Sequence, residues 1–331
     1  MMNPRTKTGG WAWLCLLMLC YPVISQSVMI LEYETKLTGE PQSVRPSSVT
    51  LDLHANGICV TDEASRAIDI FDARGFHLYR TDATSDIAAP KDGSIDSQGG
   101  FVFTDLAAEG KRTIERLNYL GEPEVYNPEI PREGWSPRHL IITTDGHYIT
   151  VDRSGLLAKH DSQSGSLIWM LELVDPESEN ADMLGRPTEA PDHRIYIPGS
   201  KMRTIFYVSP DGDLLGSFGR RGTQRGEFTF PIGVAFDSVG RVLVLDRMRH
   251  KILLFTSEHE FVDEFGRMGD GPGNLYHPVA IATSPDGRVY VAQGFEGRVQ
   301  VFRLIDTASA PSALNLSKPT AEREETPTGE R

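Results

Sequence analysis

The sequence has little cysteine, no excess of basic residues and no convincing helical periodicity between Val28 and Leu304. Cysteine occurs three times, and Cys15 and Cys20 fall in an apolar segment near the N-terminus. Cys59 is left without an internal partner, and its apolar surroundings predict a small buried side chain rather than a disulfide. Lys and Arg number 33 against 46 Asp and Glu, a net charge of −13. This balance excludes a general polyanion binder, so we expect no nucleic-acid partner.

The first 27 residues have the pattern of an export signal. Arg5 and Lys7 precede the apolar run 11–20, and a proline and small residues follow it. This order predicts a cleaved signal peptide over 1–27 and a secreted or periplasmic protein. The alternative is a membrane anchor, because an uncleaved segment would extend without charge to Leu31. A membrane is therefore expected as a partner only if cleavage does not occur.

Internal repetition is the strongest signal in the remaining chain. Five segments begin with proline, continue as a short β-rich run, turn through Asp, Gly or Asn, and continue as a second β-rich run. They are 46–64, 90–107, 137–154, 231–247 and 278–294. The opening prolines are 44, 47, 94 and 47 residues apart, and the gap of 94 is two periods. A degraded sixth copy is therefore expected at 186–200.

A third and a fourth β-rich run follow the first two in the complete copies. Four strands in a unit of about 46 residues, repeated six times, are typical of a six-bladed β-propeller. The last copy ends after its third strand, and 29–46 overlays 214–231 without a gap. We therefore expect an all-β propeller over 28–305, with four-stranded antiparallel blades and the N-terminal strand completing the last blade. The polar composition of 306–331 predicts a disordered C-terminal tail.

The repeat has a recognisable motif: proline, strand, Asp-x-x-Gly turn, strand ending in Val-x-Asp, strand ending in Phe, and strand ending in Phe-Gly. The best copies are 226–266 and 273–303. This pattern resembles the NHL repeat. The resemblance implies a six-bladed propeller, and NHL propellers act as binding platforms and occasionally as enzymes. It therefore leaves the function open.

Four of the second strands end at an aspartate in the same register. These residues are Asp62, Asp105, Asp152 and Asp246. A recurring carboxylate at this position favours a structural role, in which it accepts hydrogen bonds from backbone amides of the adjoining loop.

The binding surface is expected on one face of the propeller. The loops that join the fourth strand to the first, and the second to the third, share this face and are longer and more charged than the turns opposite. Basic segments 220–226 and 247–251 should meet there. The candidate binding residues are Arg138, His139, Arg220, Arg221, Arg225, Arg247, Arg249 and His277. They would recruit a protein, or an anionic ligand or glycan; the competing interpretation is arginines paired with nearby carboxylates.

A zinc-dependent lyase is one enzymatic alternative, because some NHL-type propellers resemble such an enzyme. Zinc would need several imidazoles near the axis. His139 and His277 adjoin opening prolines, but no third histidine does, and Asp92 or Glu189 would have to complete the set.

A sugar-lactonase-type propeller is the other enzymatic alternative. Its calcium would need carboxylates and amides, for which Asp92, Asp237 and Asn274 are candidates by position alone. We predict no catalytic residue, no metal ligand and no cofactor, and expect a monomeric binding scaffold. A metal-dependent lyase or a lactonase-type hydrolase at the mouth of the central channel remains the alternative, with zinc or calcium as its metal.

Overall fold

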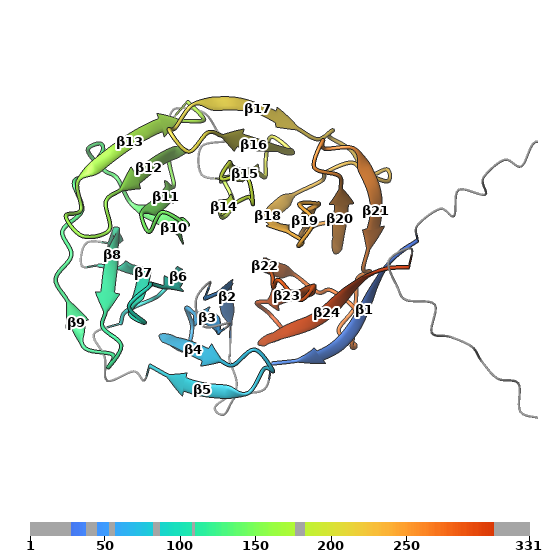
Figure 1. The fold of residues 1–331 in the computed structure, drawn as a ribbon, viewed down its shortest axis with the longest axis horizontal. Coiled ribbons are helices and arrows are strands. Elements are labelled where there is room, and N and C mark those ends of the chain that lie inside the picture. Colours follow the sequence, from blue (N-terminus) through green and yellow to red (C-terminus); the bar gives the residue numbers. More distant parts are fainter. Residues whose placement is uncertain are drawn as a thin grey trace, which may run out of the picture. The chain divides into compact units, whose positions relative to one another are not determined.

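The strands of the described chain form six four-stranded sheets around one axis (Figure 1). The computed structural model describes residues 28–37, 45–52, 57–81, 87–107, 110–175 and 183–307. The predicted signal peptide and the predicted tail after Thr307 lie outside these residues. The sheets confirm the six-bladed all-β propeller. In the described ranges, no helix has the length and apolar character of a membrane span.

The blades follow one another along the chain. Blade 1 consists of β2 (Pro46–Leu51), β3 (Ile58–Asp62), β4 (Ala67–Phe71) and β5 (His77–Arg80). Blade 2 consists of β6 (Asp92–Ile95), β7 (Phe101–Leu106), β8 (Arg112–Leu117) and β9 (Pro123–Glu124). Blade 3 consists of β10 (Pro137–Ile142), β11 (Tyr148–Asp152), β12 (Leu156–His160) and β13 (Leu167–Glu172). Blade 4 consists of β14 (Thr188–Glu189), β15 (Ile195–Gly199), β16 (Thr204–Val208) and β17 (Leu214–Phe218). Blade 5 consists of β18 (Pro231–Phe236), β19 (Val242–Asp246), β20 (Lys251–Phe255) and β21 (Phe261–Phe265). Blade 6 consists of β22 (Pro278–Thr283), β23 (Arg288–Gln293), β24 (Arg298–Asp306) and β1 (Met29–Lys36).

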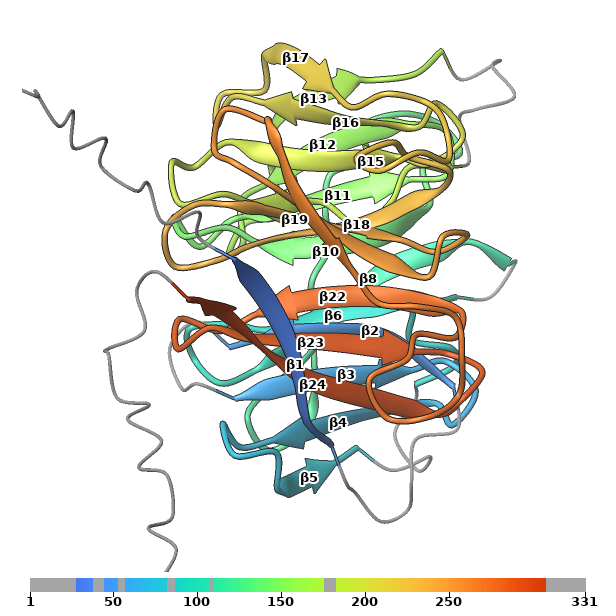
Figure 2. The same ribbon diagram turned by 90° about the vertical axis from the view of Figure 1, so that its right-hand side faces the viewer.

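The two ends of the propeller chain close blade 6. The strand order in this sheet is β1-β24-β23-β22, and Figure 2 shows β1 beside β24. The Leu37 amide donates to the Val299 carbonyl at 2.9 Å, and the rings of Tyr33 and Phe302 meet edge to face at 6.0 Å. The predicted closure by the first strand is therefore confirmed, and it pairs an edge that would otherwise be open.

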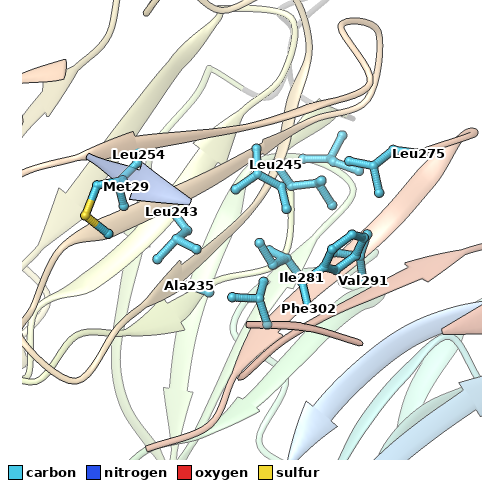
Figure 3. Close-up of a cluster of buried hydrophobic side chains, with 12 residues drawn as sticks. Met29, Ala235, Leu243, Leu245, Leu254, Leu275, Ile281, Val291 and Phe302 are labelled. Atoms are coloured by element: carbon cyan, nitrogen blue, oxygen red, sulfur yellow. The ribbon is translucent and has the colours of Figure 1, made fainter. Parts of the chain in front are cut away.

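The hydrophobic core lies mainly between neighbouring blades. The cluster in Figure 3 joins Leu243, Leu245 and Leu254 of blade 5 to Ile281 and other side chains of blade 6. Since both faces of a blade carry apolar side chains, a single blade cannot bury them, and stacking around the axis does.

The recurring aspartates accept hydrogen bonds from loop amides, as the sequence predicted. Asp246 accepts from the Thr229 amide at 2.7 Å and from the Met248 amide at 3.1 Å, which ties two loops together. In blade 6 a glutamine takes this position, and Gln293 Oε1 accepts from the Tyr276 amide at 2.8 Å. The carboxylates are thus part of the blade framework.

Cys59 lies in β3 and is 1% exposed. This exposure confirms the small buried side chain that the sequence predicted, and burial raises the pKa of its thiol to about 12.

Candidate functional site

At the inner edge of each blade one residue occupies an equivalent position near the axis; it lies in the innermost strand of five blades and two residues before β14 in blade 4. These residues are Ser48, Asp92, His139, Arg186, Gly233 and Ala280, each two residues after the position of the opening proline. In blade 4 the proline is replaced by Leu184, which pairs with Gly199 as Pro231 pairs with Asp246. We call this set the axial position. It is charged or ionisable in blades 2, 3 and 4 and small in the other three.

The three ionisable residues at the axial position are joined by hydrogen bonds. Arg186 Nε donates to Asp92 Oδ1 at 2.9 Å, and His139 Nδ1 lies 3.1 Å from Asp92 Oδ2. Asp92 Oδ2 also accepts from the Leu140 amide at 3.3 Å, while Arg186 Nη2 donates to the Leu140 carbonyl at 3.2 Å. The contacts extend across three blades, so the position of each group depends on the other two.

The buried carboxyl of Asp92 is ionised. Burial by itself would raise its pKa, but the charge of Arg186 and the hydrogen bond from His139 lower the pKa to about 2. An ionised carboxylate only accepts hydrogen bonds, so Nδ1 of His139 carries the proton. Burial lowers the pKa of His139, and the positive charges of Arg138 and Lys91 lower it further. The hydrogen bond and the negative charge of Asp92 act in the opposite direction. At neutral pH, His139 is therefore a neutral imidazole with Nε2 unprotonated.

Further cations lie beside this group. Lys91 Nζ contacts Glu63 Oε2 at 3.2 Å, and Arg112 Nη2 contacts Glu63 Oε1 at 2.6 Å. Burial lowers the pKa of Lys91; Glu63 opposes this shift, and the charges of Arg138 and Arg112 add to it. Arg247 donates from Nε to the Pro278 carbonyl at 3.2 Å.

Arg138 lies within the electrostatic reach of groups from three blades. Its charge contributes to the lowered pKa of Lys91 in blade 2, His139 in blade 3 and Arg247 in blade 5; burial is the larger cause in each case. We call the whole set the axial cluster: Glu63, Lys91, Asp92, Arg112, Arg138, His139, Arg186 and Arg247. It contains five cations and two carboxylates, on a chain with a net charge of −13.

The other arginines predicted for the binding surface lie away from the axis. Arg220 is 78% exposed and contacts Glu227 at 2.9 Å, and Arg225 pairs with Asp263. Arg221 is exposed.

Arg249 differs from its neighbours because it is largely buried. Its side chain is 9% exposed and contacts Glu264 Oε2 at 2.8 Å; it also donates to the Glu227 carbonyl at 2.8 Å. This arginine therefore fastens one loop to another, and its charge is neutralised within the fold.

His277 lies in the loop before β22. Its ring meets those of Tyr276 at 4.6 Å and Phe295 at 4.7 Å and lies 5.9 Å from that of His250. The structure thus places Arg138, His139 and Arg247 in one cluster, Arg220, Arg221, Arg225 and Arg249 on the outer loops, and His277 in an aromatic group.

Sequence reasoning missed Glu63, Lys91, Arg112 and Arg186 as site residues. A signal was present, because Asp92, His139, Arg186, Gly233 and Ala280 are spaced by 47 residues. Comparing one position across all copies, including the degraded one, would have found the three interacting groups.

The residues suggested for zinc or calcium have other partners. Asp92 contacts Arg186 and His139, and Asp237 contacts Arg241 Nε at 2.6 Å. Asn274 accepts from Arg267 Nε at 2.7 Å. Within the part of the chain that the structure describes, no three His, Cys, Asp or Glu side chains are arranged to hold a metal ion. A cluster this rich in cations is also unfavourable for a divalent cation.

Glu189 lies elsewhere in the fold. It contacts Thr144 in the turn between β10 and β11, on the face opposite the axial cluster. It is therefore on the wrong face to complete a metal site with His139 at this end of the axis.

Comparisons with known proteins support the fold. No family model matches the chain, and no curated protein matches it in sequence. A streptogramin B lyase has a TM-score of 0.59 and 14% identity over 84% of this chain and 98% of its own. A Bacteroides thetaiotaomicron protein of unknown function has a TM-score of 0.64 and 11% identity, over 85% of this chain and 77% of its own. Virginiamycin B lyase from Staphylococcus aureus has a TM-score of 0.56 and 15% identity, over 84% of this chain and 100% of its own. The chain is therefore a six-bladed β-propeller similar in fold to these proteins.

Proposed function

We propose that this protein is an exported, NHL-type propeller that acts as a binding scaffold, and that its axial cluster receives a carboxylate-bearing group of a partner. The partner docks on the face formed by the loops between fourth and first strands and between second and third strands. The sequence pattern of residues 1–27 supports export, and the repeat motif supports the NHL type.

The observation that carries the proposal is the gathering of cations around Arg138. Lys91, Arg138 and Arg247 come from three different blades, and the charge of Arg138 acts on both of the others in a partly buried setting. Such an arrangement raises the free energy of the unliganded protein, because like charges repel more strongly where water is excluded. An anion placed among them relieves this repulsion and forms charge-assisted hydrogen bonds with guanidinium groups.

A labelled hexaglutamate peptide tests this proposal, with hexaglutamine as the uncharged control. Fluorescence anisotropy should show that hexaglutamate binds and hexaglutamine does not, and affinity should fall with salt. Arg138→Glu should weaken binding about tenfold or more, equivalent to about 1.4 kcal/mol. Arg221→Glu, an equal charge change on the outer loop, should have a much smaller effect. Equal losses in both variants would assign binding to general surface charge instead.

A second candidate function is acid–base catalysis at His139, and the Asp92–His139 contact favours it. A carboxylate that fixes Nδ1–H orients the ring and leaves Nε2 to take a proton from a bound substrate. The neighbouring Arg138 and Lys91 would stabilise negative charge developing on that substrate. This chemistry suits a lyase or a lactonase-type hydrolase, and the streptogramin B lyase and virginiamycin B lyase compared above have a similar fold.

A panel of lactones and streptogramin B compounds distinguishes the two candidates. An enzyme should turn over at least one of them, and His139→Gln should abolish turnover while leaving hexaglutamate binding largely intact. Binding that depends on Arg138, without turnover of any of these substrates, would support the scaffold.

A further inference from the structure

A second site lies on the opposite face, at the seam between blades 3 and 4, which adjoin each other in Figure 1. A pocket of about 400 Å³ opens there. Its walls include Thr144, Asp145, Lys159, Glu189, Ile195 and Pro210. This volume falls within the range of small-molecule sites. We call it the seam pocket.

One wall of the seam pocket is held by a network that crosses the two blades. Glu189 Oε2 accepts from the Thr144 amide at 2.6 Å, and Glu189 Oε1 accepts from the Thr144 hydroxyl at 2.8 Å. His193 Nδ1 lies 2.9 Å from Glu189 Oε1. His193 has a positive φ of 67° in the turn between the first two strands of blade 4. At the equivalent turn position, blade 3 has Gly146 and blade 6 has Gly287, which also have positive φ. The pocket is therefore shaped by the fold before any ligand arrives.

Lys159 supplies hydrogen-bond donors to the seam pocket. Its side chain is 7% exposed, and Nζ donates to Asp145 Oδ2 at 2.6 Å. An ammonium group has three N–H donors. Asp145 is its one acceptor among the described residues, so donors remain for an oxygen atom of a ligand in the pocket.

The charges of the walls select a neutral ligand. An anion would meet the carboxylates of Asp145 and Glu189, and a cation would meet the ammonium of Lys159. A polyhydroxylated molecule accepts a hydrogen bond from Lys159 and donates to the carboxylates with its neighbouring hydroxyls. Pro210 offers an apolar wall to the C–H groups of such a molecule, and its carbonyl is held by Trp169 Nε1 at 2.9 Å.

We propose that the seam pocket binds one sugar residue, with adjacent hydroxyls placed between Lys159 and the carboxylates of Asp145 and Glu189. The sugar is either a free monosaccharide or the terminal residue of a glycan, since both present the same hydroxyls. This site is separate from the axial cluster and does not depend on the function proposed for it.

Calorimetric titration of the purified protein with glucose, galactose and mannose, and with their methyl glycosides, tests the proposal. At least one sugar should bind saturably. Binding of the methyl glycoside as well would point to a glycan terminus, and binding of the free sugar alone to a monosaccharide. Lys159→Met should weaken binding about tenfold or more, because a hydrogen bond to a charged group is lost. Lys111→Met, at an exposed lysine of blade 2, is the matched control and should change nothing.

Thr144→Val keeps the test decisive if Lys159→Met fails to fold. Thr144 is exposed, and the substitution removes its hydroxyl while leaving its amide in place. It should also weaken sugar binding. The proposal would be overturned if no sugar bound saturably, or if acetate or phosphate bound more tightly than every sugar. It would also be overturned if the wild type and the Thr144 variant bound sugar equally.

Discussion

Two groups of cations on the same face of the propeller are balanced in different ways. On the outer loops Arg220, Arg225 and Arg249 contact three different carboxylates, those of Glu227, Asp263 and Glu264. In the axial cluster five cations are grouped with Asp92 and Glu63. The loop arginines are close in sequence, whereas the axial cations come from five different segments. The difference shows that arginines close in sequence can belong to the framework, while the repeat gathers cations from distant segments at the axis.

The largest expected effect comes from removing the carboxylate that organises the axial cluster. Asp92→Ala leaves Arg186 and His139 without their common partner in a buried place. We expect the free energy of unfolding to fall by about 3–5 kcal/mol. Chemical denaturation followed by intrinsic fluorescence measures it.

Gly233→Ala is the matched change at the axial position of blade 5. The added Cβ would lie 3.0 Å from Ile281 Cγ2, a contact that small adjustments relieve, so a loss below about 2 kcal/mol is expected. If Asp92→Ala and Gly233→Ala lowered the free energy of unfolding equally, the charged network would contribute no more to stability than packing does.

A second comparison separates the loop arginines from one another. Arg249→Ala leaves Glu264, whose side chain is 7% exposed, with Lys251 as its remaining ion-pair partner, and should cost about 2–3 kcal/mol. Arg221→Ala, at an exposed side chain, should change stability by less than about 0.5 kcal/mol. Thermal unfolding monitored by circular dichroism compares them. Similar melting temperatures for the two variants would contradict a structural role for Arg249.

A smaller effect concerns pH. The pKa values of His139, His160, His250 and His259 are lowered, chiefly by burial. The unfolded chain binds protons near pH 6.5 that the folded chain does not, so stability falls as pH drops from about 7 to about 5. Asp92, with its pKa lowered to about 2, loses its stabilising charge only below this window.

His139→Gln should therefore flatten the dependence of stability on pH between about 5 and 7 without removing it. Denaturation curves at several pH values measure this slope. An unchanged slope would mean that the imidazole of His139 takes up a proton in the folded protein as readily as in the unfolded one.

The smallest effect is expected at the axial position of blade 1. Ser48 is 2% exposed, and its hydroxyl has no hydrogen-bond partner among the described residues. Ser48→Ala should leave stability unchanged or raise it by up to about 1 kcal/mol, because a buried hydroxyl without a partner is unfavourable. Urea denaturation can resolve this change. A loss above about 1 kcal/mol would reveal a role for this hydroxyl that the contacts do not explain.

The sequence was sufficient to predict the fold because the fold is a repeat. The spacing of Pro46, Pro90, Pro137, Pro231 and Pro278 determines the number of blades, and the missing fourth strand of the last copy predicts the closure. Both depend on backbone pairing, which β-rich runs and turn residues encode locally.

The candidate site was predicted only in part. Arg138, His139 and Arg247 were named from their places after a proline or in a basic segment, but Asp92 was considered only as a metal ligand. Its contact with Arg186 crosses two blade boundaries and joins residues 94 apart in sequence. The seam pocket was not predicted, because its shape depends on side chains of two blades and no local pattern specifies it.

A crystal structure of the protein soaked with malonate tests the central claim most directly. Malonate carries two carboxylates and is small enough to reach any exposed cation. The account predicts malonate bound among Lys91, Arg138 and Arg247, within hydrogen-bond distance of at least two of these side chains. Malonate bound at Arg220, Arg221 or Arg225, with none beside Arg138, would contradict it.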